Sequence, residues 1–185
     1  MNAFSYKNRN LYAENVAISA IAAEVGTPLY IYSTQAMQEA YKAFTNAFSS
    51  QRTQVCFAMK SNSNLAVIKT FADLGAGADV VSNGELMKAI SAGVKPKKIV
   101  YSGVGKTYEE LSAGIEAGIL QFNVESLPEL LSLSDIAASK NTSVDIAIRV
   151  NPDVDAETHH KISTGRREDK FGIDISSLIG KLSEL

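Results

Sequence analysis

Short apolar runs alternate with longer amphipathic stretches along most of the chain. The apolar runs predict buried β-strands, and they cover residues 55–59, 78–81, 98–101, 120–124 and 144–150. The stretches between them have apolar residues at helical spacing and predict helices over residues 64–74, 84–92, 108–117 and 128–139. Nearly continuous apolar strands that alternate with helices are typical of an α/β fold with a parallel sheet, whose functional residues lie at the carboxyl ends of the strands.

The pattern is different before residue 50. Residues 11–25 have apolar positions close to helical spacing and predict a short helix that stops at a Gly-Thr-Pro turn. Residues 29–32 are rich in β-forming side chains and predict a strand. Either Ser33 or Thr34 can cap the helix that follows, whose apolar positions are Met37, Tyr41, Phe44 and Phe48.

The regular repeat of strand and helix fits a closed barrel or an open doubly wound sheet, and its even spacing favours a TIM barrel. We therefore expect an N-terminal segment over residues 1–33 and the front part of a barrel over residues 34–185. A closed barrel has eight strands and about 250 residues, so the chain is expected to be the front part of something larger. Residues 174–185 predict the start of another helix, with Ile175, Leu178, Ile179 and Leu182 on one face.

Composition and charge narrow the possible partners. With 45% hydrophobic and 21% charged residues, the 185-residue chain has an ordinary globular composition, which excludes a disordered protein. A net charge of -2 provides no basic surplus for nucleic acid or anionic membranes, and no apolar run reaches the roughly 18 residues of a membrane span. The single Cys56 and an opening without a secretory apolar core favour the cytoplasm. With nucleic acids and membranes excluded as partners, we expect the protein to bind a small molecule.

Lys60 is the first candidate for chemistry. It directly follows the apolar run 55–59, at the strand end where barrels of this class place catalytic groups. An amine in a partly desolvated barrel mouth adopts the neutral, nucleophilic form more readily, and this suits a Schiff base. The alternative is a solvated lysine at a strand end, which position alone favours.

Several segments, taken in order, resemble the pyridoxal-phosphate-dependent decarboxylases of the alanine-racemase-like (fold type III) family. Residues 57–64, Phe-Ala-Met-Lys-Ser-Asn-Ser-Asn, are similar to the cofactor-lysine motif of that family. The continuation is similar to the members that act on diaminopimelate, and the matching segments are residues 75–86, 101–107, 149–155, 158–165 and 170–173. Residues 11–14 and 26–30 also resemble the start of those proteins. The resemblance therefore covers nearly the whole chain.

The resemblance implies that Lys60 forms a Schiff base with pyridoxal 5'-phosphate. The implied reaction is decarboxylation of meso-2,6-diaminopimelate to L-lysine and CO2, in which the pyridinium ring serves as the electron sink. Asp79 is implied to lie beside the cofactor lysine, whereas its position alone leaves the capping of a turn equally open. Arg149, near the end of the fifth predicted strand, is implied to bond the cofactor's 3'-oxygen, and an ion pair between helices is the alternative.

Other residues have weaker claims. His159, Ile162 and Ser163 lie in a long polar stretch after the fifth strand, where they can face the substrate or belong to a connecting loop. Glu85 begins a helix, where a carboxylate favours the helix dipole. No metal is predicted, because the only two histidines are adjacent and their side chains point apart in an extended segment.

Residues 102–107 have glycines and a lysine but do not match the pattern of a nucleotide-binding loop. The Walker pattern needs a glycine five positions before Gly105, and Val100 stands there. Residues 75–77, Gly-Ala-Gly, follow a predicted helix and precede a strand, which is the reverse of the dinucleotide-binding order.

In the family, further functional residues lie later in the chain, in the rest of the barrel and in a C-terminal β domain, and we expect these 185 residues to lack both. The resemblance also implies that the full-length protein is a homodimer with active sites between the subunits. We therefore expect the 185-residue chain alone to be inactive. Two alternatives stay open: a related decarboxylase of another basic amino acid or of carboxynorspermidine, and a non-catalytic, barrel-derived binding module.

Overall fold

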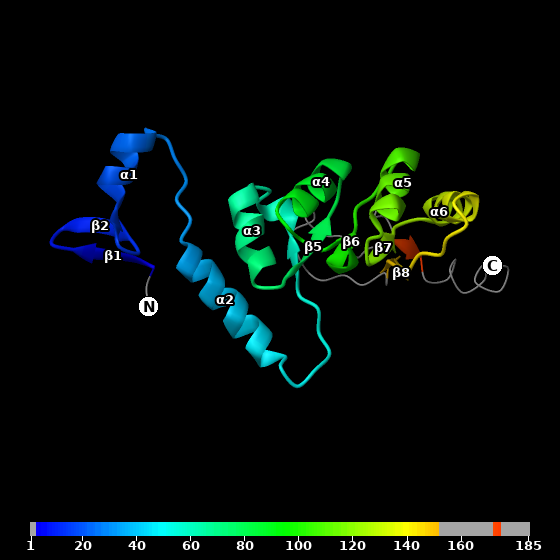
Figure 1. Cartoon of the computed structure of the whole chain (residues 1–185), viewed down its shortest axis with the longest axis horizontal. Helices are drawn as coiled ribbons and strands as arrows, with labels where there is room; N and C mark the ends of the chain where they lie inside the picture. Colours follow the sequence, from blue (N-terminus) through cyan, green and yellow to red (C-terminus); the bar gives the residue numbers. More distant parts are fainter. Residues whose placement is uncertain (1–2, 152–171, 175–185) are drawn as a thin grey trace.

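A five-stranded parallel sheet forms the centre of the protein (Figure 1). The computed structural model describes residues 3–151 and 172–174. The strands follow one another in sequence order across the sheet. They are β4 (Cys56–Ala58), β5 (Gly77–Val80), β6 (Ile99–Tyr101), β7 (Gln121–Val124) and β8 (Ile146–Ile148).

The helices that connect these strands stand in sequence order along one face of the sheet (Figure 1). They are α3 (Leu65–Asp73), α4 (Asn83–Ser91), α5 (Tyr108–Ala117) and α6 (Leu127–Ser139), and a 3₁₀ turn, η2 (Pro96–Lys98), precedes β6. A doubly wound sheet carries helices on both faces and reverses its strand order, whereas a barrel does neither. The arrangement is that of consecutive barrel units, which confirms the predicted fold class.

Side-chain caps fix where these helices begin. Each is preceded by a residue whose side-chain oxygen accepts a hydrogen bond from a backbone N–H of the first turn; these residues are Asn64, Ser82, Thr107 and Ser126. The Glu110 carboxylate reaches back to the N–H of Thr107 and also accepts from the N–H of Asn83 on α4. Burial raises the pKa of Glu110, but these hydrogen bonds outweigh it and the net pKa is lowered. Glu110 thus joins the starts of two neighbouring helices.

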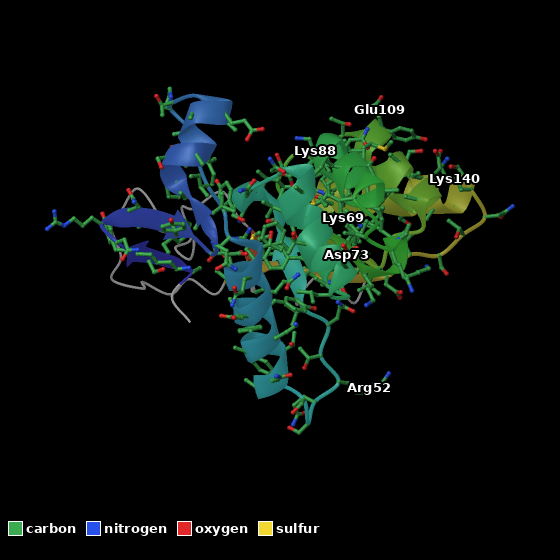
Figure 2. The ribbon with its side chains drawn as sticks, turned by 60° about the vertical axis from the view of Figure 1, so that its left-hand side comes forward. Arg52, Lys69, Asp73, Lys88, Glu109 and Lys140 are labelled. Carbon is green, nitrogen blue, oxygen red and sulfur yellow. The ribbon has the colours of Figure 1, made fainter. Side chains whose placement is uncertain are left out.

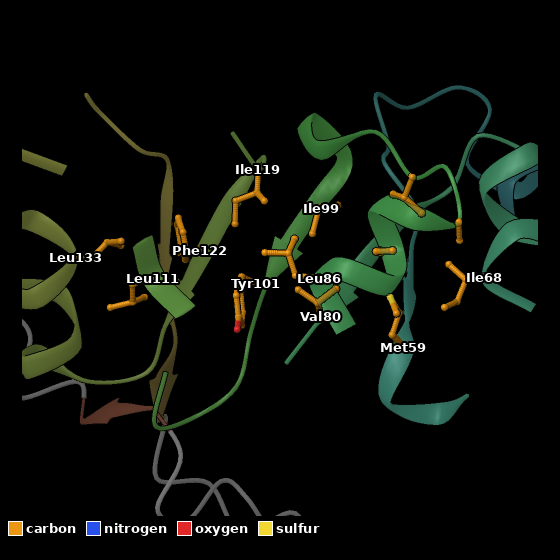
Figure 3. Packing of buried hydrophobic residues seen from close by; sticks show 14 of the residues in the cluster. Met59, Ile68, Val80, Leu86, Ile99, Tyr101, Leu111, Ile119, Phe122 and Leu133 are labelled. Atoms are coloured by element: carbon orange, nitrogen blue, oxygen red, sulfur yellow. The ribbon is translucent and has the colours of Figure 1, made fainter. Parts of the chain in front are cut away.

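The two faces of the sheet differ in chemistry because side chains alternate along each strand. The parallel register sets Ala78 beside Ile99 and Tyr101 beside Phe122 on the face that meets the helices. Side chains on this face are almost completely buried (Figure 3), and they include Met59, Val80, Ile99, Tyr101, Phe122 and Val124. Burying one large apolar side chain stabilises a fold by about 1.5–3 kcal/mol. This layer between sheet and helices is therefore the core.

The opposite face, which we call the inner face, is polar and only half buried. By register it consists of Ala58, Asp79, Val100, Ser102, Gln121, Asn123 and Ala147. Its side chains are small or polar, so it adds little apolar burial. In a barrel, this face lines the interior.

The N-terminal part forms a separate small sheet. The strands β1 (Phe4–Lys7), β2 (Asn10–Ala13) and β3 (Val16–Ala17) pair antiparallel, and only Ile18–Val25 is helical (α1). The helix predicted over residues 11–25 is therefore wrong in its first half. Arg9 and Glu14 adopt positive φ of 66° and 54° at the two turns, which allows the chain to fold back and satisfy the backbone of β2 by strand pairing.

The strand predicted over residues 29–32 is also wrong, since this segment pairs with no described strand and its Tyr30 side chain is 90% exposed. The next helix, α2 (Thr34–Ala47), is capped by Ser33. Glu14 Oε1 accepts hydrogen bonds from Ser33 Oγ at 2.7 Å and from the N–H of Gln35 at 2.9 Å, and these bonds lower the pKa of Glu14. Glu14 thereby links the small N-terminal sheet to α2.

Two corrections apply after β7. The fifth barrel strand is shorter than predicted, and the chain continues into β9 (Val150–Asn151). Asp174, predicted to start a helix, lies in β10 (Ile173–Asp174), which pairs in parallel with β9. Residues 175–185 lie outside the described part. No helix in the described ranges is long and apolar enough to cross a membrane.

The tight contact between α5 and the sheet generates a prediction for Gly114→Ala. A Cβ at Gly114 would lie 2.7 Å from Cζ of Phe122, a ring that is buried and stacked 6.0 Å from Tyr101. We expect this overpacking to cost about 1–3 kcal/mol, of which alanine recovers roughly 1 kcal/mol through its higher helix propensity, so that the free energy of unfolding falls by up to about 2 kcal/mol. Urea unfolding of the full-length protein measures the change.

Gly84→Ala on α4 is the matched control for this substitution. Among the described residues, the atom nearest to a Cβ added at Gly84 is Ser82 Oγ at 3.9 Å, an ordinary contact. We expect Gly84→Ala to leave the unfolding midpoint unchanged or slightly raised. Equal midpoints for both variants would contradict the packing argument.

Candidate functional site

A hollow of roughly 390 Å³ opens at the carboxyl ends of the parallel strands, within the range of about 300–1,000 Å³ typical of small-molecule sites. It brings together Lys60, Asp79 and Arg149, the three residues predicted to bind the cofactor. Its other lining residues are Ser102, Asn123, Glu125, Ala147 and Ile148. None of these five was predicted from the sequence to be a site residue.

Lys60 reaches this hollow from the end of β4. The strand stops at Ala58, and the chain turns through one 3₁₀ turn, η1 (Met59–Ser61). The fully buried Met59 anchors that turn in the core, and Ser61 Oγ donates to the carbonyl of Ala58 at 2.7 Å. The Lys60 amine makes no hydrogen bond or ion pair with any residue that the structure describes. It is therefore an exposed amine on a fixed turn, available to a ligand.

Asp79 faces the hollow from the inner face of β5 and receives a chain of hydrogen bonds. Ser102 Oγ donates to Asp79 Oδ1, and Asn123 Nδ2 donates to Ser102 Oγ at 2.9 Å. Gln121 Nε2 in turn donates to Asn123 Oδ1 at 2.8 Å. We call Gln121, Asn123 and Ser102 the polar relay. In the sequence, these three residues could have been recognised as site candidates only because each is polar and lies within or just after a mainly apolar strand.

Arg149 enters the hollow from the segment that follows β8. Its Nη1 lies 3.2 Å from both carboxylate oxygens of Glu125, whose side chain is only 4% exposed. The alternative considered from sequence was an ion pair between helices, but the partner is a residue directly after β7. Glu125 and Arg149 thus place paired charges at the rim of the hollow.

Lys106 forms a buried clamp beneath this rim. Its side chain is 1% exposed, and Nζ donates to the carbonyls of Gly103 and Asn123, each at 2.8 Å, and to Glu129 Oε1 at 2.6 Å. All three ammonium donors are satisfied. The other oxygen, Glu129 Oε2, accepts from the N–H of Glu125 at 3.4 Å. The glycine- and lysine-containing segment after β6 therefore fixes the ends of β6 and β7 against α6.

Other candidates take different positions. Glu85 caps α4, because its Oε2 accepts from the N–H of Val81 at 2.8 Å while its own N–H donates to Ser82 Oγ. Burial raises the pKa of the Cys56 thiol, whose Sγ lies 3.8 Å from the Lys98 carbonyl oxygen. Within the described ranges, no group of three metal-ligating side chains is close enough to hold an ion. The substrate candidates His159, Ile162 and Ser163 lie outside the described residues.

The donor set of the hollow is suited to a pyridoxal group. An unpaired amine can react with an aldehyde, a carboxylate can hold that amine when it carries a proton, and a guanidinium can donate to an anionic oxygen. A family model described as pyridoxal-dependent decarboxylase, pyridoxal binding domain, matches residues 34–185. The chain belongs to this family of pyridoxal-dependent decarboxylases. Its family cofactor is therefore pyridoxal 5'-phosphate.

Curated relatives of this decarboxylase family resemble the chain over nearly its whole length. A diaminopimelate decarboxylase from Pseudomonas aeruginosa is 49% identical over 175 residues, which is 95% of this chain and 42% of the relative. One from Haemophilus influenzae is 45% identical over 176 residues, again 95% of this chain and 42% of the relative. The chain thus spans less than half the length of these relatives.

Solved structures agree with the fold. A diaminopimelate decarboxylase from M. jannaschii in complex with L-lysine has a TM-score of 0.89 at 38% identity, covering 99% of this chain and 44% of that one. A second, from Helicobacter pylori and also complexed with L-lysine, has a TM-score of 0.83 at 40% identity, covering 88% and 41%. The resemblance to the decarboxylase family stated from the sequence is confirmed.

The buried clamp yields a prediction for Lys106→Met. This substitution leaves the Glu129 carboxylate buried without its counter-charge, and breaking such a pair costs about 3–5 kcal/mol. We expect a corresponding fall in the free energy of unfolding, measured by chemical unfolding of the full-length protein. Removing both charges in Lys106→Met/Glu129→Gln is expected to recover part of the loss.

Lys69→Met on α3 is the control. Lys69 and Asp73 form an ion pair at 2.9 Å, but their side chains are 63% and 62% exposed, on the outer surface (Figure 2). Exposed pairs contribute about 0–1 kcal/mol. A loss for Lys106→Met as small as that for Lys69→Met would show that the clamp does not stabilise the strand ends.

Proposed function

We propose that the protein catalyses pyridoxal-phosphate-dependent decarboxylation of meso-2,6-diaminopimelate to L-lysine and CO2. The observation that carries the proposal is the unpaired Lys60 amine, which shares one hollow with Asp79 and Arg149. The substrate is supported by relatives that are named diaminopimelate decarboxylases at 43–50% identity. Structures of two such decarboxylases are complexes with L-lysine.

The four charged residues of the hollow each have a defined task in this proposal. When bound, the cofactor supplies an electron sink for the electron pair that remains on the substrate α-carbon after CO2 leaves. Lys60 would hold the cofactor covalently, and Asp79 would hold the Lys60 ammonium by charge and hydrogen bonding whenever that amine is free and protonated. Arg149 donates to an anionic oxygen of the cofactor, and Glu125 keeps its guanidinium at the rim. The substrate-facing roles of His159, Ile162 and Ser163 remain part of this proposal.

We further propose that the division between the N-terminal segment and the barrel falls between residues 33 and 34. It is supported by the start of the family match at residue 34 and by the capping of α2 at Ser33. A cytoplasmic location is proposed for the protein from its single cysteine.

Covalent trapping at Lys60 tests the proposed function. The full-length protein is loaded with pyridoxal 5'-phosphate, reduced with borohydride and mapped by mass spectrometry. We expect the adduct on Lys60, and we expect Lys60→Ala to lack it and to lower lysine release from meso-diaminopimelate at least about a thousandfold, since a covalent attachment point is removed.

Lys88→Ala is the matched control, because Lys88 is an exposed lysine nearby whose Nζ donates only to Ser63 Oγ in the described ranges (Figure 2). It is expected to keep both the adduct and the activity. An adduct on another lysine would overturn the role of Lys60. A Lys60 adduct with decarboxylation of a different amino acid only would overturn the substrate and leave the cofactor site standing.

The homodimer implied by the resemblance is proposed for the full-length protein. Light scattering during size-exclusion chromatography is expected to give twice the mass of one full-length chain. A monomeric mass at the concentration of the activity assay, with activity retained, would contradict it.

A further inference from the structure

The polar relay joins three neighbouring strands across the inner face. Asp79 lies on β5, Ser102 follows β6, and Gln121 and Asn123 lie on β7. The register pairs Asp79 with Val100 and Val100 with Gln121, so that Ser102 and Asn123 stand one inner-face position further along their strands. Each relay side chain is only partly buried, and Ser102 and Asn123 both line the hollow that contains Lys60.

The direction of the hydrogen bonds in the relay is fixed by its two ends. An ionised carboxylate only accepts, so the single hydroxyl hydrogen of Ser102 must point to Asp79. Ser102 Oγ can then only accept from its other neighbour, which must present the amide Nδ2 of Asn123. This leaves Asn123 Oδ1 to accept from Gln121 Nε2. Every donor in the relay therefore points toward Asp79.

This arrangement determines which carboxylate oxygen of Asp79 remains for a ligand or for Lys60. Among the described residues, Oδ1 accepts from Ser102 and Oδ2 accepts no hydrogen bond. With Oδ1 held, rotation of the carboxylate would break a hydrogen bond to a charged group, which is among the stronger hydrogen bonds in proteins. Oδ2, both of whose lone pairs are unused among the described residues, is therefore the oxygen most open to the Lys60 ammonium.

We propose that Ser102 and Asn123 are positioning residues of the decarboxylase site, which hold Asp79 with one oxygen free to receive the Lys60 ammonium. The inference rests on the proposed function, since it concerns the moment at which Lys60 leaves the cofactor. Ser102 acts only through Asp79, and Asn123 acts only by orienting the Ser102 hydroxyl. Neither residue is required for the covalent attachment at Lys60.

A double-mutant cycle tests this role in the full-length, cofactor-loaded protein. We expect Ser102→Ala to lower the turnover rate about 10- to 100-fold, the effect of losing one hydrogen bond to a charged group. In an Asp79→Ala background the same substitution is expected to have no further effect, because its target is gone. Ser102→Thr, which keeps the hydroxyl, is expected to restore the rate.

Ser112→Ala is the matched control, because Ser112 Oγ donates to the Glu116 carboxylate at 3.2 Å on the exposed surface of α5. We expect it to leave turnover unchanged. An unchanged rate for Ser102→Ala, or an equal loss in the Asp79→Ala background, would overturn the positioning role.

A second measurement uses the protein without cofactor. Side-chain amide signals of Asn123 in ¹⁵N NMR spectra report its hydrogen bonds, and we expect both Ser102→Ala and Asp79→Ala to shift them and to speed their hydrogen exchange. Unshifted signals would show that the relay does not exist. Borohydride trapping at Lys60 is expected in Ser102→Ala, so a failure of the relay and a failure of the cofactor site give different results.

Discussion

The alternation of side chains along β4 to β8 is the constraint on which both stability and the site depend. Every second residue along a strand, such as Val80 on β5 and Tyr101 on β6, is buried against helices α3 to α6 and belongs to the core. The residues between them, such as Asp79 and Ser102, lie on the inner face. Because the register is parallel and in sequence order, polar residues from three strands meet at one end of the sheet. Ordinary strand geometry therefore assembles the hollow.

The buried ammonium group of Lys106 fixes the segments that follow strands β6 and β7, which strand pairing does not hold in place. Moving an ammonium group out of water is unfavourable unless its donors are fully used. Lys106 meets this condition only if the Gly103 carbonyl, the Asn123 carbonyl and Glu129 converge on it. The requirement holds the loop after β6, the end of β7 and the start of α6 in one arrangement. The Glu125 and Arg149 pair is attached to that arrangement through the backbone N–H of Glu125.

Much of the fold could be predicted because the sequence of each strand–helix unit by itself indicates its secondary structure. Each strand and its following helix carry their own apolar period and cap, and all five strands and four helices were found near their predicted positions. The N-terminal segment was mispredicted because residues 10–13 acquire their conformation from pairing with Phe4–Lys7, which helical spacing does not reveal. Residues 29–32 have β-forming side chains but no described strand to pair with.

Residues of the candidate site could be predicted from the sequence only where they stand in a recognisable motif. Lys60 follows an apolar run directly and stands in a motif, so the sequence alone makes it a candidate. Ser102 and Asn123 were missed because their significance comes from neighbours on other strands, which single-strand patterns do not contain. A shift of one residue in the register of β5 would place Val80 in the hollow and Asp79 in the apolar layer. The burial of Val80 therefore keeps Asp79 on the inner face, where it lines the same hollow as Lys60, so the packing of the core determines which face carries the candidate site.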